Sequence, residues 1–353
     1  MTPSVSFLTA LPSSRPSATR ARRDPRISPP PIPARNPSPS RPVILRAAKN
    51  PRISLLLLLA LLHPTPTPAQ PLAISGQAIY NLTAQLLAVA PKRYNGSPGH
   101  LAAENFIKAH FKPEAAKGDL ITDEFTATTP AGPQTMRNYI VRYPGKREGI
   151  IVLASHYETN YPLRDIDFVG ANDGACTSVL LMEIGAYLRT HPPQGYSVWL
   201  VFDDGEEAVN QWTDSDSLYG TRHLAARWYA DGTLQRIKAL IVADMIGDKD
   251  LNILEEEQST PWLRALLKQA AANTHNSAYI FKTQGAEEDD HLPFLKRGVP
   301  SLDIIDVDYG PRTPATPDGY HHTAQDTLDK ISPKSLQISA DLFLNLIRLI
   351  NQR

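Results

Sequence analysis

The sequence contains a single cysteine, Cys176, among its 353 residues. One thiol cannot form an intramolecular disulfide, and it cannot build a metal site from several thiolates. Any metal ligand must therefore be a histidine, an aspartate or a glutamate. We expect Cys176 itself to be a small buried residue and not a nucleophile, because no motif places a base beside it. The sequence also lacks an apolar run that approaches the length a membrane-spanning helix requires, which is roughly 20 residues.

An excess of charge of either sign is missing too. Lys plus Arg and Asp plus Glu each number 36. This balance removes the basic excess that is typical of nucleic-acid binding proteins. The two signs are nevertheless unevenly distributed, since Asp24 is the only acidic residue in an Arg-rich stretch before residue 53. The remainder of the chain therefore carries a net negative charge.

The N-terminal 70 residues differ in composition from the rest. Residues 1–50 are rich in Pro, Ser and Arg, a composition that predicts disorder. Residues 51–70 combine Arg52, a short leucine-rich run and a Pro/Thr stretch that ends in Ala69 and Gln70, which indicates a secretory signal peptide. We therefore expect an exported protein, periplasmic or secreted. The basic region before the apolar run is unusually long, so either translation starts downstream or the signal is atypical.

Residues 71–353 predict one α/β domain with a central mixed, mostly parallel sheet flanked by helices, because helical and strand-like segments alternate. Near-continuous apolar strands suit a sheet that is covered on both faces. Strands are expected at residues 138–143, 150–155, 197–202, 239–243 and 301–305. Helices are expected at about 75–90, 99–112, 175–190, 218–230, 260–274, 289–297 and 333–350.

Acidic residues or histidines follow several of these strands. His156 ends one strand, the adjacent pair Glu206 and Glu207 follows another, and Asp244 follows a third. In open α/β sheets ligands bind at the carboxyl ends of the strands, so these side chains are expected at one edge. Each residue alone has an ordinary explanation, such as a helix cap or a solvated charged turn. Their recurrence at equivalent positions favours a functional site.

Carboxylate and imidazole donors suit zinc, which in catalytic sites has three protein ligands and an open position. The adjacent residues Glu206 and Glu207 could also have two different roles. One carboxylate can bind the metal while its neighbour remains free to transfer a proton.

At these residues the chain resembles the zinc-dependent exopeptidase superfamily, and within it the glutaminyl-peptide cyclotransferases. The matching stretches are residues 154–158 (ASHYE), 168–175 (FVGANDGA), 202–208 (FDDGEEA) followed by Trp212, 216–225 (DSLYGTRHLA), 288–300 (EDDHLPFLKRGVP) and 321–323 (HHT). They occur in the family's order from about residue 80 to the C-terminus. The resemblance implies the zinc exopeptidase fold, peptide or protein N-termini as substrates, and cyclisation of N-terminal glutamine to pyroglutamate.

The resemblance also implies a role for each matching position. The single zinc ion would be bound by Asp173, Glu207 and His322. Glu206 would be the general base and acid. Asp244 and Asp289 would surround the reacting amide, and Trp212 would form a wall of the substrate pocket. His291 is expected to be a hydrogen-bond partner near Asp289 and not a ligand.

Two positions depart from the family pattern. The residue before the ligand histidine is usually Trp, but here it is His321, which we therefore expect at an altered substrate wall. The family's His-Tyr-Asp motif reads His156-Tyr157-Glu158 in this chain, with glutamate in place of aspartate.

Two alternatives remain open. In two-zinc aminopeptidases His156 and Asp244 correspond to ligands of a second metal, so hydrolysis of N-terminal residues with two zinc ions is one alternative. A metal-free binding domain is the other, and the intact ligand set disfavours it.

Overall fold

The computed structural model describes residues 74–353. The predictions for residues 1–50 and 51–70 lie outside these residues. The helices are α2 (Gly76–Val89), α3 (Pro98–His110), α4 (Lys112–Ala115), α5 (Cys176–Thr190), α6 (Tyr219–Ala230), α7 (Pro261–Asn273), α8 (Leu292–Leu295) and α9 (Pro333–Asn351). The strands are β1 (Leu120–Thr129), β2 (Gly132–Tyr143), β3 (Arg147–His156), β4 (Tyr196–Asp203), β5 (Ile237–Asp244), β6 (Ile253–Glu256), β7 (Ile280–Gly285) and β8 (Ser301–Ile305).

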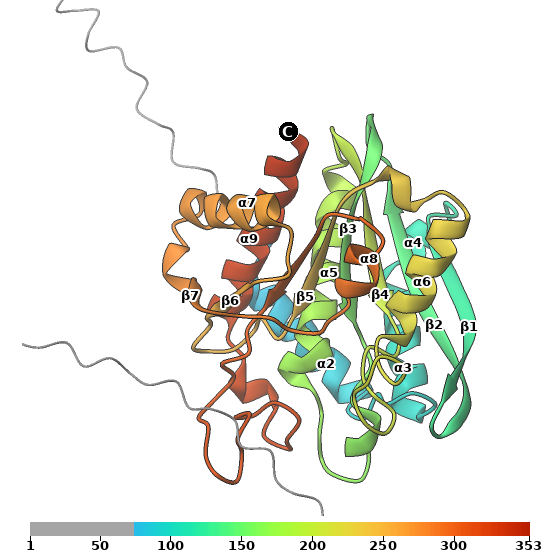
Figure 1. Ribbon diagram of the computed structural model, residues 1–353, viewed down its shortest axis with the longest axis vertical. Helices are drawn as coiled ribbons and strands as arrows, with labels where there is room; N and C mark the ends of the chain where they lie inside the picture. The colour runs from blue at the N-terminus through green and yellow to red at the C-terminus, as the bar shows by residue number, and fades with distance from the viewer. Residues whose placement is uncertain (1–73) are drawn as a thin grey trace, which may run out of the picture. The chain divides into compact units, whose positions relative to one another are not determined.

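The main sheet has six strands in the order β1-β2-β4-β3-β5-β8 (Figure 1). The neighbours β4, β3, β5 and β8 are parallel, whereas β1 and β2 pair antiparallel with each other and β2 pairs antiparallel with β4. The predicted mixed, mostly parallel sheet is therefore confirmed. A second, two-stranded sheet pairs β6 with β7.

Helices cover both faces of the main sheet, which explains why its central strands are apolar throughout. On β3, Ile151 and Leu153 pack into a core cluster that includes residues of α2, α5, α7 and α9. The intervening residues Ile150 and Val152 pack into a second cluster, with residues of α6 and α8. Successive side chains of a strand point to opposite faces, so a strand buried on both faces needs apolar residues at every position.

The expected helices and strands are mostly present, but three strands were not predicted and one helix is shorter than expected. Strands β6 and β7 lie outside the predicted ranges. The edge strand β1 was not predicted, because its polar residues alternate with buried ones only weakly and its one full neighbour is β2. The helix expected at 289–297 is confined to α8. Before it, the Asp289 carbonyl accepts the Leu292 amide at 2.9 Å and holds a turn, and after it Gly298 adopts a positive φ of 83°. Only glycine adopts that conformation readily.

The parallel strands bring their carboxyl ends to one edge of the sheet. In the register of the sheet, His156 at the end of β3 is paired with Asp203 at the end of β4, and Asp244 at the end of β5 is paired with Ile305 on β8. The loops that follow these strands therefore start close together. This edge is where the sequence predicts the site.

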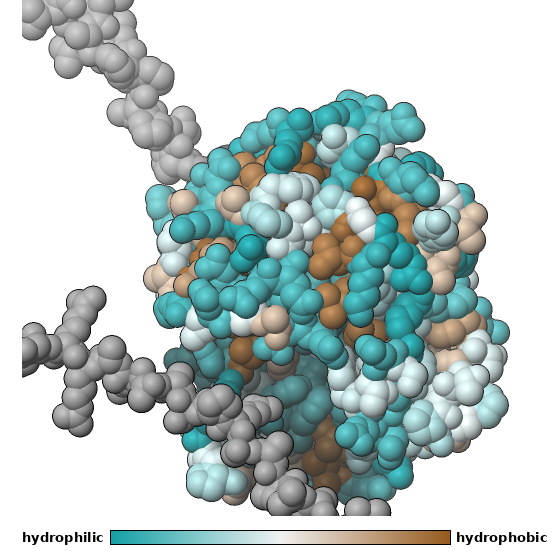
Figure 2. All heavy atoms as spheres, in the orientation of Figure 1, coloured by the Kyte–Doolittle hydropathy of each residue, from teal (hydrophilic) through white to brown (hydrophobic). Residues whose placement is uncertain are grey.

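The face of the molecule that is visible in Figure 2 is mainly polar. Hydrophilic residues cover most of the face in Figure 2, and apolar residues form small separate patches on it. Between residues 74 and 353, no helix combines the length and the apolar character needed to span a bilayer.

Candidate active site

A cavity of about 540 Å³ lies at the carboxyl edge of the sheet. Eight of the nine residues that the sequence predicts for the site line it: Asp173, Glu206, Glu207, Trp212, Asp244, Asp289, His321 and His322. The ninth, His156, is 2% exposed and lies in contact with Asp173 and Asp244. Tertiary folding thus gathers residues from six separate segments of the chain.

The three predicted metal ligands meet at the ring of His322. Its Nε2 atom lies 2.9 Å from Glu207 Oε1 and 3.5 Å from Asp173 Oδ2. Burial lowers the pKa of His322, but the charges of Glu207 and Asp173 outweigh burial and raise it to about 9. Burial likewise raises the pKa of Asp173, but His156 and His322 beside it leave the pKa below its usual range. The arrangement favours a positive charge at this point.

Asp173 lies in a tight turn between β3 and α5, and two glycines make this turn possible. Gly170 and Gly174 have positive φ values of 54° and 82°. A Cβ atom at Gly174 would lie only 2.7 Å from His156 Cε1, so the turn passes directly over the His156 ring. The turn needs glycine for both conformation and space.

Asp326, which the sequence did not single out, holds this turn from a distant segment. Its carboxylate accepts the backbone amides of Asn172 at 2.8 Å and Asp173 at 3.1 Å, and the hydroxyl of Tyr309 at 2.6 Å. Burial and the charge of Asp173 raise the pKa of Asp326 to about 6. No local pattern marks it, because the turn that it holds lies about 150 residues away in the chain.

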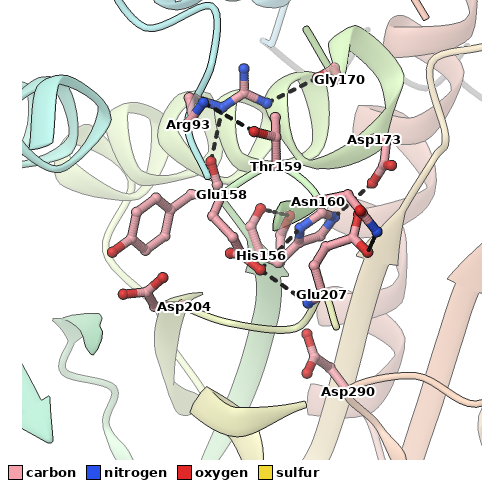
Figure 3. A network of polar contacts seen from close by, with 12 residues as sticks. Arg93, His156, Glu158, Thr159, Asn160, Gly170, Asp173, Asp204, Glu207 and Asp290 are labelled. Carbon is pink, nitrogen blue, oxygen red and sulfur yellow. Dashed lines mark hydrogen bonds and ion pairs between the residues drawn. The ribbon is translucent and has the colours of Figure 1, made fainter. Parts of the chain in front are cut away.

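A second network holds Glu207 (Figure 3). The side-chain amide of Asn160 donates to Glu207 Oε2 at 2.6 Å, and the backbone amide of Glu207 donates to Glu158 Oε1 at 3.2 Å. Glu158 replaces the aspartate of the family motif, and its carboxylate still holds the loop that carries Glu206 and Glu207. Asn160 was not predicted, although it lies within two residues of a matching stretch.

Glu206 is the free carboxyl of the pair. It is 8% exposed and lines the cavity. Burial and the neighbouring charge of Glu207 raise the pKa of Glu206 well above its usual range. Such a group can both accept and donate a proton near neutral pH.

His156, Asp173 and Asp244 form a second group of donors. His156 Nε2 lies 3.2 Å from Asp173 Oδ1 and 3.5 Å from Asp244 Oδ1. Asp173 is thus shared, with one oxygen facing His156 and the other facing His322. Burial lowers the pKa of His156, but contact with the two aspartates raises it well above its ordinary value. Either an imidazolium or a second metal ion could neutralise these carboxylates.

Asp289 extends the acidic part of the cavity. It is 3% exposed, and burial together with the charge of Asp244 raises its pKa well above the usual range. Behind it, Asp303 on β8 is fully buried, and burial and the charge of Asp289 raise the pKa of Asp303 as well. Asp303 was not predicted, yet an acidic residue within the apolar 301–305 run was a signal that could have been read.

The remaining predictions have different outcomes. Trp212 lies at the cavity, where its indole N–H donates to Glu288 Oε2 at 3.0 Å. Cys176 is fully buried, as predicted.

The prediction that His291 makes a hydrogen bond near Asp289 is wrong. Its ring nitrogens have no hydrogen-bond partner among residues 74–353, and the nearest carboxylates belong to Glu256 and Asp303 at 3.5 and 3.9 Å. Burial lowers the pKa of His291 to about 4, so the ring is neutral.

Comparisons with known proteins show the family of this chain. The model of peptidase family M28 matches residues 138–347. A glutaminyl-peptide cyclotransferase of the snake Boiga dendrophila is 32% identical over 291 residues, which cover 72% of this chain and 78% of the relative. This chain belongs to peptidase family M28, among the glutaminyl-peptide cyclotransferases.

Solved structures of family members extend the agreement. The chain is similar to the crystal structure of an Acidobacteriales bacterium glutaminyl cyclase, with 69% identity and a TM-score of 0.80 over 82% of this chain and 99% of that one. It is also similar to the Porphyromonas gingivalis glutaminyl cyclase, with 26% identity and a TM-score of 0.68 over 78% and 98%. The fold predicted from sequence is therefore that of the M28 family.

The donor atoms of the site fit the zinc ion that the family implies. Among the described residues, Asp173 Oδ2, the oxygen that faces His322, is buried without a hydrogen-bond partner. Buried polar atoms normally have partners, so an unpartnered oxygen beside His322, which also contacts Glu207, indicates a place for a cation. The donors are nitrogen and oxygen atoms, which zinc accepts.

We expect removal of the metal to destabilise the protein, and to do so more at about pH 8 than at about pH 6. Without a cation, the pKa values of Glu206 and Asp289 are raised in the folded protein. The contribution of these two groups to stability is therefore fully present below the ordinary carboxyl pKa, and it is lost as the pH rises through the raised values. The raised pKa of His322 acts in the same direction. Thermal melting with and without a chelator at both pH values measures the effect.

The variant Glu206→Gln supplies the control for this prediction, because it removes one of the repelling charges. Its metal-free form should lose less stability between the two pH values than metal-free wild type. An equal loss of stability at both pH values in wild type would contradict the electrostatic account.

Proposed function

We propose that this chain converts the N-terminal glutamine of peptides or proteins to pyroglutamate, with release of ammonia. The observation that carries the proposal is Glu206, a buried carboxyl with a raised pKa that lines the cavity beside the donors Glu207, Asp173 and His322. The high identity to a glutaminyl cyclase of known structure supports the same reading.

Asp173, Glu207 and His322 would hold one zinc ion, which when bound supplies positive charge to polarise the side-chain amide carbonyl. The reaction is intramolecular, because the α-amine and the amide belong to the same glutamine, so the protein needs only to hold the residue folded back on itself. A wall for that glutamine is provided by Trp212, which Glu288 holds by a hydrogen bond.

Glu206 carries the proton through the reaction. The α-amine nitrogen forms a bond to the amide carbon and gives a proton to the Glu206 carboxylate. The same proton passes to the departing amide nitrogen as its bond to carbon breaks, and ammonia leaves. Asp244 and Asp289 line the cavity beside Glu206, where they are placed to bind the amine or the leaving nitrogen.

We propose one zinc ion and not two. A protonated His156 already places a positive charge between Asp173 and Asp244, where a second metal would bind. The two-zinc aminopeptidase uses this same position for metal, so metal content separates the two activities.

The test compares a Gln-initiated and a Leu-initiated peptide with the purified protein, after its metal content has been measured. Loss of one ammonia from the Gln peptide alone, with about one zinc per chain, is the expected result. Release of free leucine by protein with about two metal ions per chain would replace the proposal with an aminopeptidase.

The proposal includes export, for which the signal-like segment at 51–70 is the support. Fractionation of cells that express the full chain tests it. Enzyme found only in the cytoplasmic fraction, at its full length, would contradict export.

A further inference from the structure

His321 and His322 are adjacent in sequence, yet both rings face the same cavity. Their centroids lie 3.8 Å apart with an angle of 33° between the ring planes. In an extended chain, successive side chains point to opposite sides. Here His322 adopts a positive φ of 54°, a left-handed conformation that is uncommon for a non-glycine residue and that turns the chain at this point. Strain of this kind is often found at functional sites.

Both rings lie close to the same carboxylate oxygen. Asp173 Oδ2 is 3.5 Å from His322 Nε2 and 4.0 Å from His321 Nε2. The latter distance is too long for a hydrogen bond, so a direct bond does not explain the position of His321. One donor atom from each of these three residues lies within 4.8 Å of the other two.

The distances agree with a shared ion. Zinc binds nitrogen and oxygen at about 2.1 Å in a tetrahedron, so two donors of one ion lie about 3.4 Å apart. The separation of 3.5 Å between Asp173 Oδ2 and His322 Nε2 agrees with this value, and His321 Nε2, at 4.0 Å from the same oxygen, reaches it by a small shift. The side chains of His321 and His322 are 33% and 35% exposed, but the His322 ring also packs edge-to-face on Phe168 at 6.0 Å. His321 therefore has room to move toward the ion and away from it.

We propose that His321 is an additional, displaceable ligand of the zinc ion. Resting on the proposed function, the inference adds that the His321 imidazole occupies the open position of the metal until the substrate amide replaces it. An imidazole at this place protects the metal without closing the site permanently, since a neutral nitrogen ligand on an exposed loop exchanges more readily than the buried carboxylates.

The first measurement uses the unaltered protein. X-ray absorption at the zinc edge counts the imidazole rings bound to the ion in the resting enzyme. Two rings are expected, His321 and His322. A single ring would overturn the proposal and leave His321 as part of the cavity wall.

The second measurement uses His321→Phe, which keeps an aromatic ring at the cavity. Zinc affinity from competition with a chelator should fall by about tenfold or more, the size of effect seen when groups around a metal are removed. With cobalt in place of zinc, the visible spectrum should change, and added imidazole should alter it at a concentration about tenfold lower than in wild type. Equal affinities, spectra and imidazole responses would overturn the proposal.

His223→Phe is the matched control. The His223 side chain is 34% exposed, almost the same as that of His321, but it stacks on Phe125 and contacts Asp123 away from the cavity. It should behave as wild type in each assay. These readouts do not require turnover, so failure of the Gln-peptide assay with two bound imidazoles would reject the proposed function alone. Cyclisation with one bound imidazole would reject only the role of His321.

Discussion

We expect Glu206→Gln to lower kcat for cyclisation of a Gln-initiated peptide by about 10²–10⁴-fold, the usual contribution of a general acid and base. Glutamine has nearly the same shape and can keep the cavity filled, but it can neither accept the proton of the α-amine nor return it. The loop that carries the residue is held through Glu207, Glu158 and Asn160, none of which the variant alters. Zinc content and thermal stability should therefore stay close to those of wild type.

Glu183→Gln is the control for this prediction. Glu183 lies on α5, and burial also raises its pKa, but it does not line the cavity. The same chemical change there should leave kcat unaltered. If Glu206→Gln kept more than about a tenth of wild-type activity, another carboxyl such as Asp289 would be the proton carrier, and the mechanism would have to be rewritten.

The largest loss of stability is expected from Arg93→Met. Arg93 is fully buried, and its guanidinium donates to the backbone carbonyls of Ala90, Tyr157, Val169 and Gly170 at 2.8 to 3.2 Å. Figure 3 shows the contact with Gly170. Burial lowers the pKa of Arg93 to about 10, which leaves it charged at neutral pH. Each acceptor left unpaired in the interior costs about 1–3 kcal/mol, so the total should be at least about 4 kcal/mol. The melting temperature should fall by about 10 °C or more.

The same substitution should also weaken zinc binding, because Arg93 holds the segment that leads to the active site. Its backbone amide donates to Thr159, the neighbour of Asn160, and its side chain binds Gly170 at the start of the turn that carries Asp173. Arg93→Lys should be intermediate, since an ammonium keeps the charge but not the planar set of donors.

Arg348→Met serves as the matched control for Arg93→Met. Arg348 is exposed on α9 and makes one side-chain hydrogen bond, to Asn345, so its loss should change stability by less than about 0.5 kcal/mol. Equal melting temperatures for the two variants would show that the buried hydrogen bonds of Arg93 do not contribute to the stability of the fold.

Much of the fold followed from local patterns. The unbroken apolar runs of β3, β4 and β5 predicted buried parallel strands, and both core clusters confirm that each face of the sheet is covered. The edge strand β1 was not predicted, because its polar residues form a strand by pairing with β2 and show no clear strand pattern of their own.

The sequence by itself determined the chemistry that this protein can offer. With one cysteine, the donors had to be carboxylates and imidazoles, and their position at the ends of parallel strands directed them to one edge. The family motifs then indicated a role for each. These inferences succeed because donor type and strand position are local properties of the chain.

Only the tertiary structure decided how the site is held and which donors meet. Arg93 and Asp326 hold the site through partners far away in the chain, so no local pattern could reveal them. The side-by-side rings of His321 and His322 likewise depend on one backbone torsion that the surrounding loop imposes. Such contacts arise from the packing of distant segments, and the energy of a buried charge depends on every group that the fold places around it.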